Sequence, residues 1–240
     1  HQRAMPLSFS VIVPVLGEES LVNRLVDHLR TVGYGRNIEI VIADGHPERS
    51  TLAALSRSNV LALAAPPGRA RQMNAGARQA SGDMLLFLHA DCSLPAGAFE
   101  AMERVIEGGR QAGAFDLGIR SDRASLRLVA SVATLRSRLT RTPYGDQGIF
   151  VTRKAFEAVG GFEDLPILED VDLVRRLRRS GFRLGFAKGR VTTLPRRWEA
   201  EGVWRRTLAN WAIIALYLLG VAPEKLLPLH HLKHAKGGDA

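Results

Sequence analysis

Short apolar segments that alternate with helix-forming segments are the feature that most constrains the fold of this chain. Four segments have the nearly continuous apolar character of strands covered on both faces: 9–13, 38–43, 60–64 and 84–88. Segments with helical periodicity lie between them. The first has an apolar stripe over 21–29, and the helix is expected to end at Gly33. This alternation is typical of βαβ units. It predicts an open, mainly parallel α/β sheet in the first hundred residues.

The pattern changes after Pro95. Short strands are expected around 113–117, 149–152 and 182–187, with helices between them and loops at 142–145 and 164–166. A helix is also expected from about Glu201. The second half is therefore predicted to be mixed α+β.

Charge and cysteine content restrict the partners and the compartment. The chain has 33 Lys and Arg against 24 Asp and Glu, a net charge of +9. This excess favours an anionic partner such as a phosphate-bearing substrate, a nucleic acid or an acidic membrane surface. The single cysteine, Cys92, cannot form an internal disulfide, so a reducing, cytoplasmic location is expected.

Acidic residues follow three of the four apolar segments, where open sheets bind their ligands. Glu18 follows the first segment, Asp44 the second and Asp91 the fourth. Each has a simpler explanation: Glu18 can favour a helix start, Asp44 can form an Asp-Gly turn and Asp91 can cap the next helix. Asp91, however, follows a strand too apolar to need a carboxylate, and a divalent ion bound to phosphates would use one there.

Two phosphate-binding motifs are absent. The chain has neither G-x-G-x-x-G at its first helix nor G-x-x-x-x-G-K-[ST], which argues against dehydrogenases and P-loop enzymes. Arg69 and Arg71 instead stand at a loop-to-helix junction, where guanidinium and backbone N–H groups can meet a phosphate together. The alternative is a solvated basic turn.

An acidic first turn and a basic last turn mark the helix expected after Leu168. The helix dipole alone explains this arrangement. A helix N-terminus also favours an ionised carboxylate, which suits a base that takes a proton from a hydroxyl group. Glu169 and Asp170 are the candidates.

Several of these segments, taken in order, resemble one family. The motifs are Ser10-Val11-Ile12-Val13-Pro14, Glu18, Asp44, Asn74-Ala75-Gly76, Ala80-Ser81-Gly82-Asp83 before Leu86-Phe87-Leu88-His89-Ala90-Asp91, Gly160-Gly161-Phe162 and Glu169-Asp170. They are similar to the family 2 inverting glycosyltransferases of GT-A fold, from about Ser10 to Trp198. Segments 68–74, 89–91 and 144–147 look most like the small bacterial group called selenodomain-associated transferase 2.

The resemblance implies roles for individual residues. It assigns nucleotide binding to Pro14, Glu18, Asp44, Arg71, Asn74 and Ala90. Asp91 matches the last Asp of the family's D-x-D motif, which binds Mg²⁺ or Mn²⁺, and His89 replaces the first Asp. Asp170 matches the catalytic base and Glu169 its partner. Acceptor or diphosphate contacts fall to Asp146, Gln147, Arg196, Arg197 and Trp198, although the Gln of the Q-x-x-R-W motif of processive relatives is missing.

The expected division follows from these roles. Residues 1–5 are interpreted as a cloning remnant, 6–200 as the GT-A-like domain, and 201–240 as a C-terminal helix and basic tail. Within the domain, 6–95 is the nucleotide-binding half and 96–200 the acceptor and catalytic half.

The apolar segment 208–222 is too short to span a bilayer. Flanked by Trp and Arg residues, it is predicted to attach the protein to the inner face of the cell membrane, with packing or a homodimer contact as the alternatives.

The sequence thus predicts a divalent-metal-dependent inverting glycosyltransferase that uses a nucleotide-diphosphate sugar donor and a hydroxyl acceptor, for which a lipid-linked compound is one candidate. One alternative is a sugar nucleotidylyltransferase, although its Gly-rich basic loop is replaced by an acidic segment at 15–19. Another is a non-catalytic protein that binds nucleic acid or anionic lipid. No nucleic-acid partner is expected, because the arginines of 175–179 have no aromatic residues among them.

Overall fold

A computed structural model describes residues 7–230, and the predicted remnant 1–5 and the end of the basic tail, 231–240, lie outside this range. The first four predicted strands are present as β1 (Phe9–Val15), β2 (Ile38–Asp44), β3 (Leu61–Ala64) and β4 (Met84–Phe87). They are parallel, with β1 between β2 and β4 and with β3 beside β2. The prediction of a parallel sheet is therefore confirmed.

The strands of the second half extend the same sheet. Its order is β3-β2-β1-β4-β7-β6-β8-β5, in which the later strands are β5 (Cys92–Ser93), β6 (Ala112–Ile119), β7 (Ile149–Thr152) and β8 (Leu184–Thr193). β7 is antiparallel to β4 and β6, and β8 is parallel to β6. β8 runs further than expected, because it resumes pairing with β6 after an irregularity and reaches Thr193.

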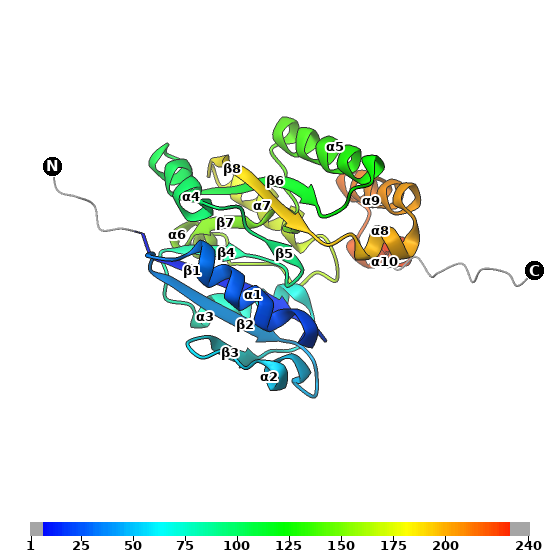
Figure 1. Cartoon of the computed structure of the whole chain (residues 1–240). Coiled ribbons are helices and arrows are strands. Elements are labelled where there is room, and N and C mark those ends of the chain that lie inside the picture. The colour runs from blue at the N-terminus through cyan, green and yellow to red at the C-terminus, as the bar shows by residue number, and fades with distance from the viewer. Residues whose placement is uncertain (1–6, 231–240) are drawn as a thin grey trace, which may run out of the picture.

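Helices cover both faces of the sheet (Figure 1). Alternate residues of β1 point to opposite faces: Val11 and Val13 pack with α1 (Glu19–Val32) and α4 (Ala98–Glu107), whereas Ile12 belongs to the core on the other face. The helices of that second face are α3 (Arg69–Gln79), α6 (Arg153–Ala158) and α7 (Glu169–Arg179). The short α2 (Ser50–Ala54) lies beside α1. These two cores place the starts of α3 and α7 near the ends of β1 and β4.

One strand does not have the predicted environment. β3 was expected to be covered on both faces, but three of its four residues are exposed. It is one of the two edge strands of the sheet, so no strand of residues 7–230 lies along its outer side. Continuous apolar character did not distinguish this edge strand from the central ones.

The C-terminal part forms three helices where one was expected. They are α8 (Arg196–Glu201), α9 (Val203–Leu218) and α10 (Pro223–His230). Gly202 and Gly220 separate them with backbone φ angles of 85° and 95°, which favour glycine. Figure 1 shows these helices beside the end toward which β8 points, next to α5 (Ala124–Thr140). Within residues 7–230, no helix has the length and apolar character needed to cross a membrane.

Candidate active site

A cavity of about 830 Å³ lies beyond the carboxyl ends of β1, β4 and β8. Its other walls come from the short 3₁₀ helix η1 (Gly145–Gln147), the start of α7 and the helices α8 to α10. The size is within the range of small-molecule sites. Ten of the residues predicted from the sequence line it: Pro14, Glu18, His89, Ala90, Asp91, Asp146, Asp170, Arg196, Arg197 and Trp198.

Three aspartates, Asp91, Asp146 and Asp170, line this cavity. Burial, followed by the charges of Asp170 and Asp91, raises the pKa of Asp146 to about 6, although Arg136 opposes the rise. The Oδ1 atom of Asp146 is buried and accepts no hydrogen bond from the described residues. Because buried polar atoms in proteins are nearly always paired, this oxygen is free to accept a hydrogen bond from a ligand.

The carboxylate of Asp170 is held by two backbone groups. The N–H of Gly145 donates to Oδ2 at 2.5 Å, and the N–H of Val171 donates to Oδ1 at 2.8 Å. A Cβ on Gly145 would lie 2.8 Å from Nε2 of His89 and 3.1 Å from Oδ2 of Asp170. The lack of a side chain at Gly145 therefore allows η1 to approach Asp170 closely, and the carboxylate is fixed before any ligand binds.

Glu169, the neighbour of Asp170, points into the protein. It is buried and forms an ion pair with Arg69, whose Nε lies 2.8 Å from Oε1, and it accepts a hydrogen bond from Nη2 of Arg69 at 3.2 Å to Oε2. Burial raises the pKa of Glu169, and the Arg69 guanidinium opposes that rise. Leu168, just before the helix, has a φ of 65°, an uncommon conformation for a residue with a branched side chain. This backbone turn leads into a helix whose first two residues face different surroundings.

His89 stays neutral near pH 7. Burial, followed by the positive charge of Arg69, lowers its pKa to about 4, and the carboxylates of Asp91 and Asp170 only partly compensate. A neutral imidazole can act as a ligand for a metal or as a hydrogen-bond partner. His89 therefore adds no positive charge to the cavity.

Asp91 is the residue best placed to receive a divalent cation. Its Oδ2 lies 3.5 Å from Nη2 of Arg196. The two terminal nitrogens of Arg196 also donate hydrogen bonds to the two carboxylate oxygens of Glu18. Among residues 7–230, no group of three His, Cys, Asp or Glu side chains could hold a metal ion by itself. A cation that takes one carboxylate from the protein and its other ligands from substrate phosphates and water fits this arrangement, which is common for Mg²⁺.

Arginines also line the cavity and supply positive charge to it. Burial, followed by the charges of Arg206 and Arg69, lowers the pKa of Arg197. Within residues 7–230, Nη1 of Arg197 lies 3.4 Å from Nε2 of His230, and Arg197 forms no ion pair with a carboxylate. Such a guanidinium retains its charge and is available to an anion.

Five predicted residues do not line the cavity. The two oxygens of Asp44 accept hydrogen bonds from the N–H groups of His46 at 2.8 Å and Leu52 at 3.1 Å, so this buried carboxylate shapes the loop after β2. Arg71 points to the surface and pairs with Asp164 at 2.8 Å. Glu169, described above, is the third.

The other two hold neighbouring loops. Asn74 exchanges two hydrogen bonds with the backbone of Phe162, at 2.8 and 2.9 Å. Gln147 is buried and accepts hydrogen bonds from the Ser137 hydroxyl and the Tyr144 N–H, while its amide donates to the Phe115 carbonyl. Both side chains thus stabilise the walls of the cavity from behind.

The sequence alone did not identify several residues of the cavity. Tyr144 lines it with a buried hydroxyl group that has no partner in the described chain, and Arg136 covers the Tyr144 ring with its guanidinium carbon 3.5 Å from the ring centre. Arg206 is buried and donates to Glu201 and to the His230 carbonyl. Tyr144 belonged to a recognised motif, whereas no pattern in the sequence distinguished Arg136 or Arg206 from the other arginines.

Comparisons with known proteins agree with this architecture. The family model described as glycosyl transferase family 2 matches residues 10–152. A solved structure of the mannosyltransferase PcManGT from Pyrobaculum calidifontis, in complex with GDP-Man and Mn²⁺, is similar with a TM-score of 0.64 and 20% identity, covering 93% of this chain and 68% of that one. S. aureus TarS 1-349 is similar with a TM-score of 0.58 and 13% identity, covering 93% and 69%. A comparison with curated proteins finds no match.

Proposed function

Since the chain belongs to glycosyl transferase family 2 and is a glycosyltransferase, we propose that it transfers a sugar from a nucleotide-diphosphate donor to an acceptor hydroxyl with inversion. The observation that carries this proposal is that Asp91 and Asp170 line one cavity with the basic wall at Arg197. The GDP-Man and Mn²⁺ named for the similar mannosyltransferase support a nucleotide sugar and a divalent ion as its ligands. The narrower resemblance to the selenodomain-associated transferase 2 group stays a prediction.

In the proposed reaction, Asp170 is the general base. The acceptor oxygen attacks the anomeric carbon while its proton passes to the Asp170 carboxylate. A new carbon–oxygen bond forms on one face of the sugar, and the bond to the diphosphate breaks on the other, so the anomeric configuration inverts. The Gly145 and Val171 N–H groups fix the orientation of the carboxylate and leave lone pairs on both oxygens for the proton.

The leaving diphosphate carries the negative charge that develops in the reaction. Arg197 on the cavity wall would bind it, because its guanidinium is desolvated and faces no carboxylate partner in residues 7–230. Asp91 would hold Mg²⁺ or Mn²⁺, which would neutralise charge on the diphosphate. The neutral His89 imidazole beside Asp91 is a second candidate ligand for that ion.

Other predicted residues have supporting roles in this proposal. Glu169 positions Asp170 through its ion pair with Arg69. Pro14, Glu18 and Ala90 line the nucleotide side of the cavity, whereas Asp44, Arg71 and Asn74 act from outside it. Trp198 has a buried indole N–H without a partner among the described residues, so it can donate to an acceptor or sugar hydroxyl.

We further propose that the protein attaches to an anionic membrane surface and that its acceptor is lipid-linked. The exposed faces of α5 and α9 support this. On α9, Trp204 and Leu208 are 58% and 60% exposed, and Trp211 continues the same stripe one turn later. On α5, Leu128, Leu135 and Leu139 form a matching exposed stripe.

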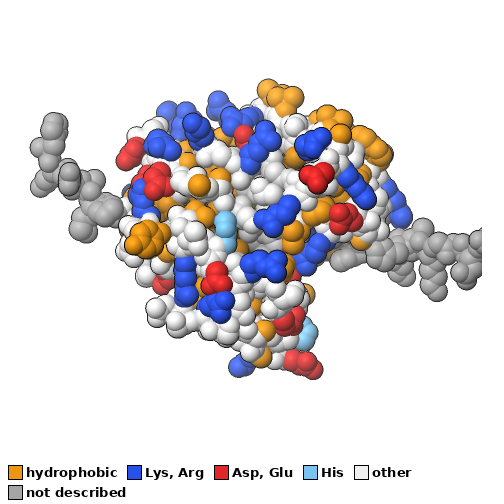
Figure 2. All heavy atoms as spheres, in the orientation of Figure 1, with side chains coloured by type: hydrophobic (Ala, Val, Ile, Leu, Met, Phe, Trp, Pro, Cys, Tyr) orange, Lys and Arg blue, Asp and Glu red, His pale blue; other side chains and the backbone are white. Residues whose placement is uncertain are grey.

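The arrangement of charge favours a bilayer over a second protein copy as the occupant of this face. α5 and α9 contact each other, and their two exposed stripes together are called here the α5–α9 face. Figure 2 shows hydrophobic side chains over these helices with Lys and Arg side chains beside them. Aromatic and aliphatic side chains flanked by cations are typical of proteins that lie on anionic lipid.

A screen of donors tests the proposed function. We expect one class among UDP-, GDP- and dTDP-sugars to raise the melting temperature of the protein in the presence of Mn²⁺. Asp91→Ala should abolish this shift without changing the melting temperature of the free protein, because Asp91 is partly exposed and packs in no core. An undiminished shift in Asp91→Ala, or no shift with any donor, would contradict the proposal.

A further inference from the structure

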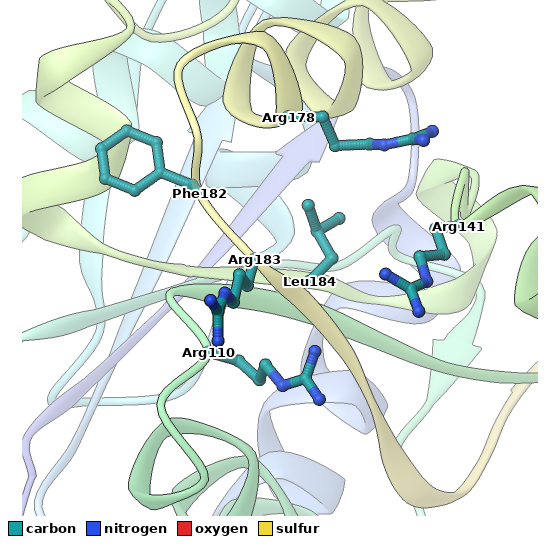
Figure 3. Close-up of a pocket in the computed structure, with 6 residues that line it drawn as sticks. All are labelled: Arg110, Arg141, Arg178, Phe182, Arg183 and Leu184. Atoms are coloured by element: carbon teal, nitrogen blue, oxygen red, sulfur yellow. The ribbon is translucent and has the colours of Figure 1, made fainter.

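A second cavity, of about 350 Å³, lies away from the active site and is surrounded by arginines. It is lined by Arg110, Arg141, Arg178, Phe182, Arg183 and Leu184. Figure 3 shows the guanidinium groups of Arg110 and Arg141 extending toward each other below Leu184, with the Phe182 ring pointing the other way. No acidic side chain is among the residues that line this cavity.

The ends of three helices meet at this cavity, which suggests a simpler explanation for the arginines. Arg110 follows α4, Arg141 caps α5, and Arg178 lies in the last turn of α7. Cations near helix C-termini interact favourably with the exposed carbonyl groups, and Arg178 does donate to the Thr140 carbonyl at 2.9 Å. Helix ends therefore account for one of the four guanidinium groups.

They do not account for the other three. Within the described part of the chain, the side chains of Arg110, Arg141 and Arg183 make no hydrogen bond or ion pair. Some arginines elsewhere do have carboxylate partners: Arg57 pairs with Asp27 at 2.7 Å, and Arg138 pairs with Asp116 at 2.8 Å. The cavity thus collects like charges, and no carboxylate lines it.

We propose that this arginine cavity binds a phosphate group. Guanidinium groups bind phosphate oxygens through paired N–H donors, and several arginines around one space suit a compact anion with more than one negative charge. Leu184 offers an apolar contact to whatever carries the phosphate. The site is separate from the active site, because it lies at the C-terminal end of α7 and Asp170 lies at the N-terminal end. It does not depend on the proposed function.

The phosphate can come from two sources, a soluble compound or a lipid headgroup. The second is close at hand, because Leu139, which is 75% exposed on the α5–α9 face, is two residues from Arg141. The shared chemistry is the phosphate itself. Two probes, inorganic pyrophosphate and vesicles that contain phosphatidic acid, distinguish the sources.

The test compares the full chain with Arg110→Gln/Arg141→Gln. In calorimetric titration with pyrophosphate at low salt and with EDTA, we expect the parent to bind. We expect the affinity of the double variant to be lower by at least about tenfold, given the usual strength of hydrogen bonds to charged groups. Arg24→Gln/Arg78→Gln is the matched control, since it removes two exposed arginines on α1 and α3 and changes the net charge equally.

Vesicle flotation forms the second arm. If the pyrophosphate isotherm is the same in the double variant and the control, but only the double variant floats less with phosphatidic acid in phosphatidylcholine, the site is supported with a lipid headgroup as its ligand. If the double variant matches the control in both assays, the proposal is overturned. Loss of pyrophosphate binding in the double variant alone supports the site with a soluble ligand.

Discussion

Two adjacent carboxylates, Glu169 and Asp170, show how strongly a single position determines a residue's chemistry. Glu169 is buried against Arg69, and Asp170 lines the cavity under two backbone N–H groups. Removing one partner of a buried ion pair typically costs about 3–5 kcal/mol, because the other charge is left uncompensated. Loss of the Arg69 charge would therefore leave the buried Glu169 carboxylate uncompensated beside the proposed base.

Asp146 allows a prediction about stability and pH. Its pKa in the folded protein, about 6, is above its ordinary value of 3.8, so the folded state disfavours the charged form. This destabilisation is complete above pH 6, and it fades as the pH falls toward the ordinary value. We expect Asp146→Asn to increase the free energy of unfolding at pH 7.5 by about 1–3 kcal/mol and by less at pH 5.

Thermal unfolding at the two pH values measures this difference. Asp122→Asn, which neutralises an exposed carboxylate that does not line the cavity, is the control and should leave the stability nearly unchanged at both. Loss of stability in Asp146→Asn at pH 7.5 would mean that the charged form makes favourable contacts in the folded state.

At the scale of elements, α9 has two different faces. Ile213 is buried with Ile167 and Leu226, and Asn210 and Ile214 line the active-site cavity. The opposite side of the helix carries the apolar stripe that begins at Trp204. One helix therefore connects the proposed membrane surface with the proposed acceptor region, and a deletion of the C-terminal helices would damage both.

Point substitutions test the α5–α9 face more cleanly than a deletion. We expect Trp204→Ser/Leu208→Ser to reduce co-sedimentation of the full chain with anionic vesicles several-fold, because each change removes apolar surface that would enter the bilayer interface. Tyr34→Ser, which removes an exposed aromatic ring just after the C-terminal end of α1, serves as the control. Parent protein that fails to bind the vesicles, or that forms a dimer abolished by the same substitutions, would favour a protein contact at this face.

For the whole molecule, local patterns predicted the first half better than the second. Strands β1, β2 and β4 have long apolar character because both faces are covered, and this was visible in the sequence. β8 was not fully visible, since its later residues include Lys188, Gly189 and Arg190 on an exposed stretch beyond an irregularity. Pairing with β6, which is distant in sequence, holds that stretch in the sheet.

The same contrast applies to the active site. Residues that follow strands, such as Asp91, were predictable because parallel strands bring their carboxyl ends to one edge. Arg206 and His230 enter the cavity through the packing of α8, α9 and α10, which no local pattern indicated. Asp44 and Arg71 matched motifs, but the hydrogen bonds and the ion pair that direct their side chains elsewhere depend on residues that only the fold places beside them.

The central claim is that Asp170 acts as the base of an inverting sugar transfer. Asp172→Asn is the matched control, because Asp172 is on the same helix turn but pairs with Arg176 at 2.6 Å and accepts a hydrogen bond from Tyr217. We expect Asp170→Asn to lower turnover by about 10²–10⁴-fold with little change in donor affinity. Glu169→Gln should lower turnover less, and Asp172→Asn least.

The most direct measurement is proton NMR of the sugar product at early times, after the parent has transferred or released the sugar of a donor that it accepts. The same reaction is followed with Asp170→Asn. The account predicts that the product initially has the anomeric configuration opposite to that of the donor and that Asp170→Asn forms it far more slowly than Asp172→Asn does. A product that keeps the donor's configuration, or equal rates for the two variants, would contradict it.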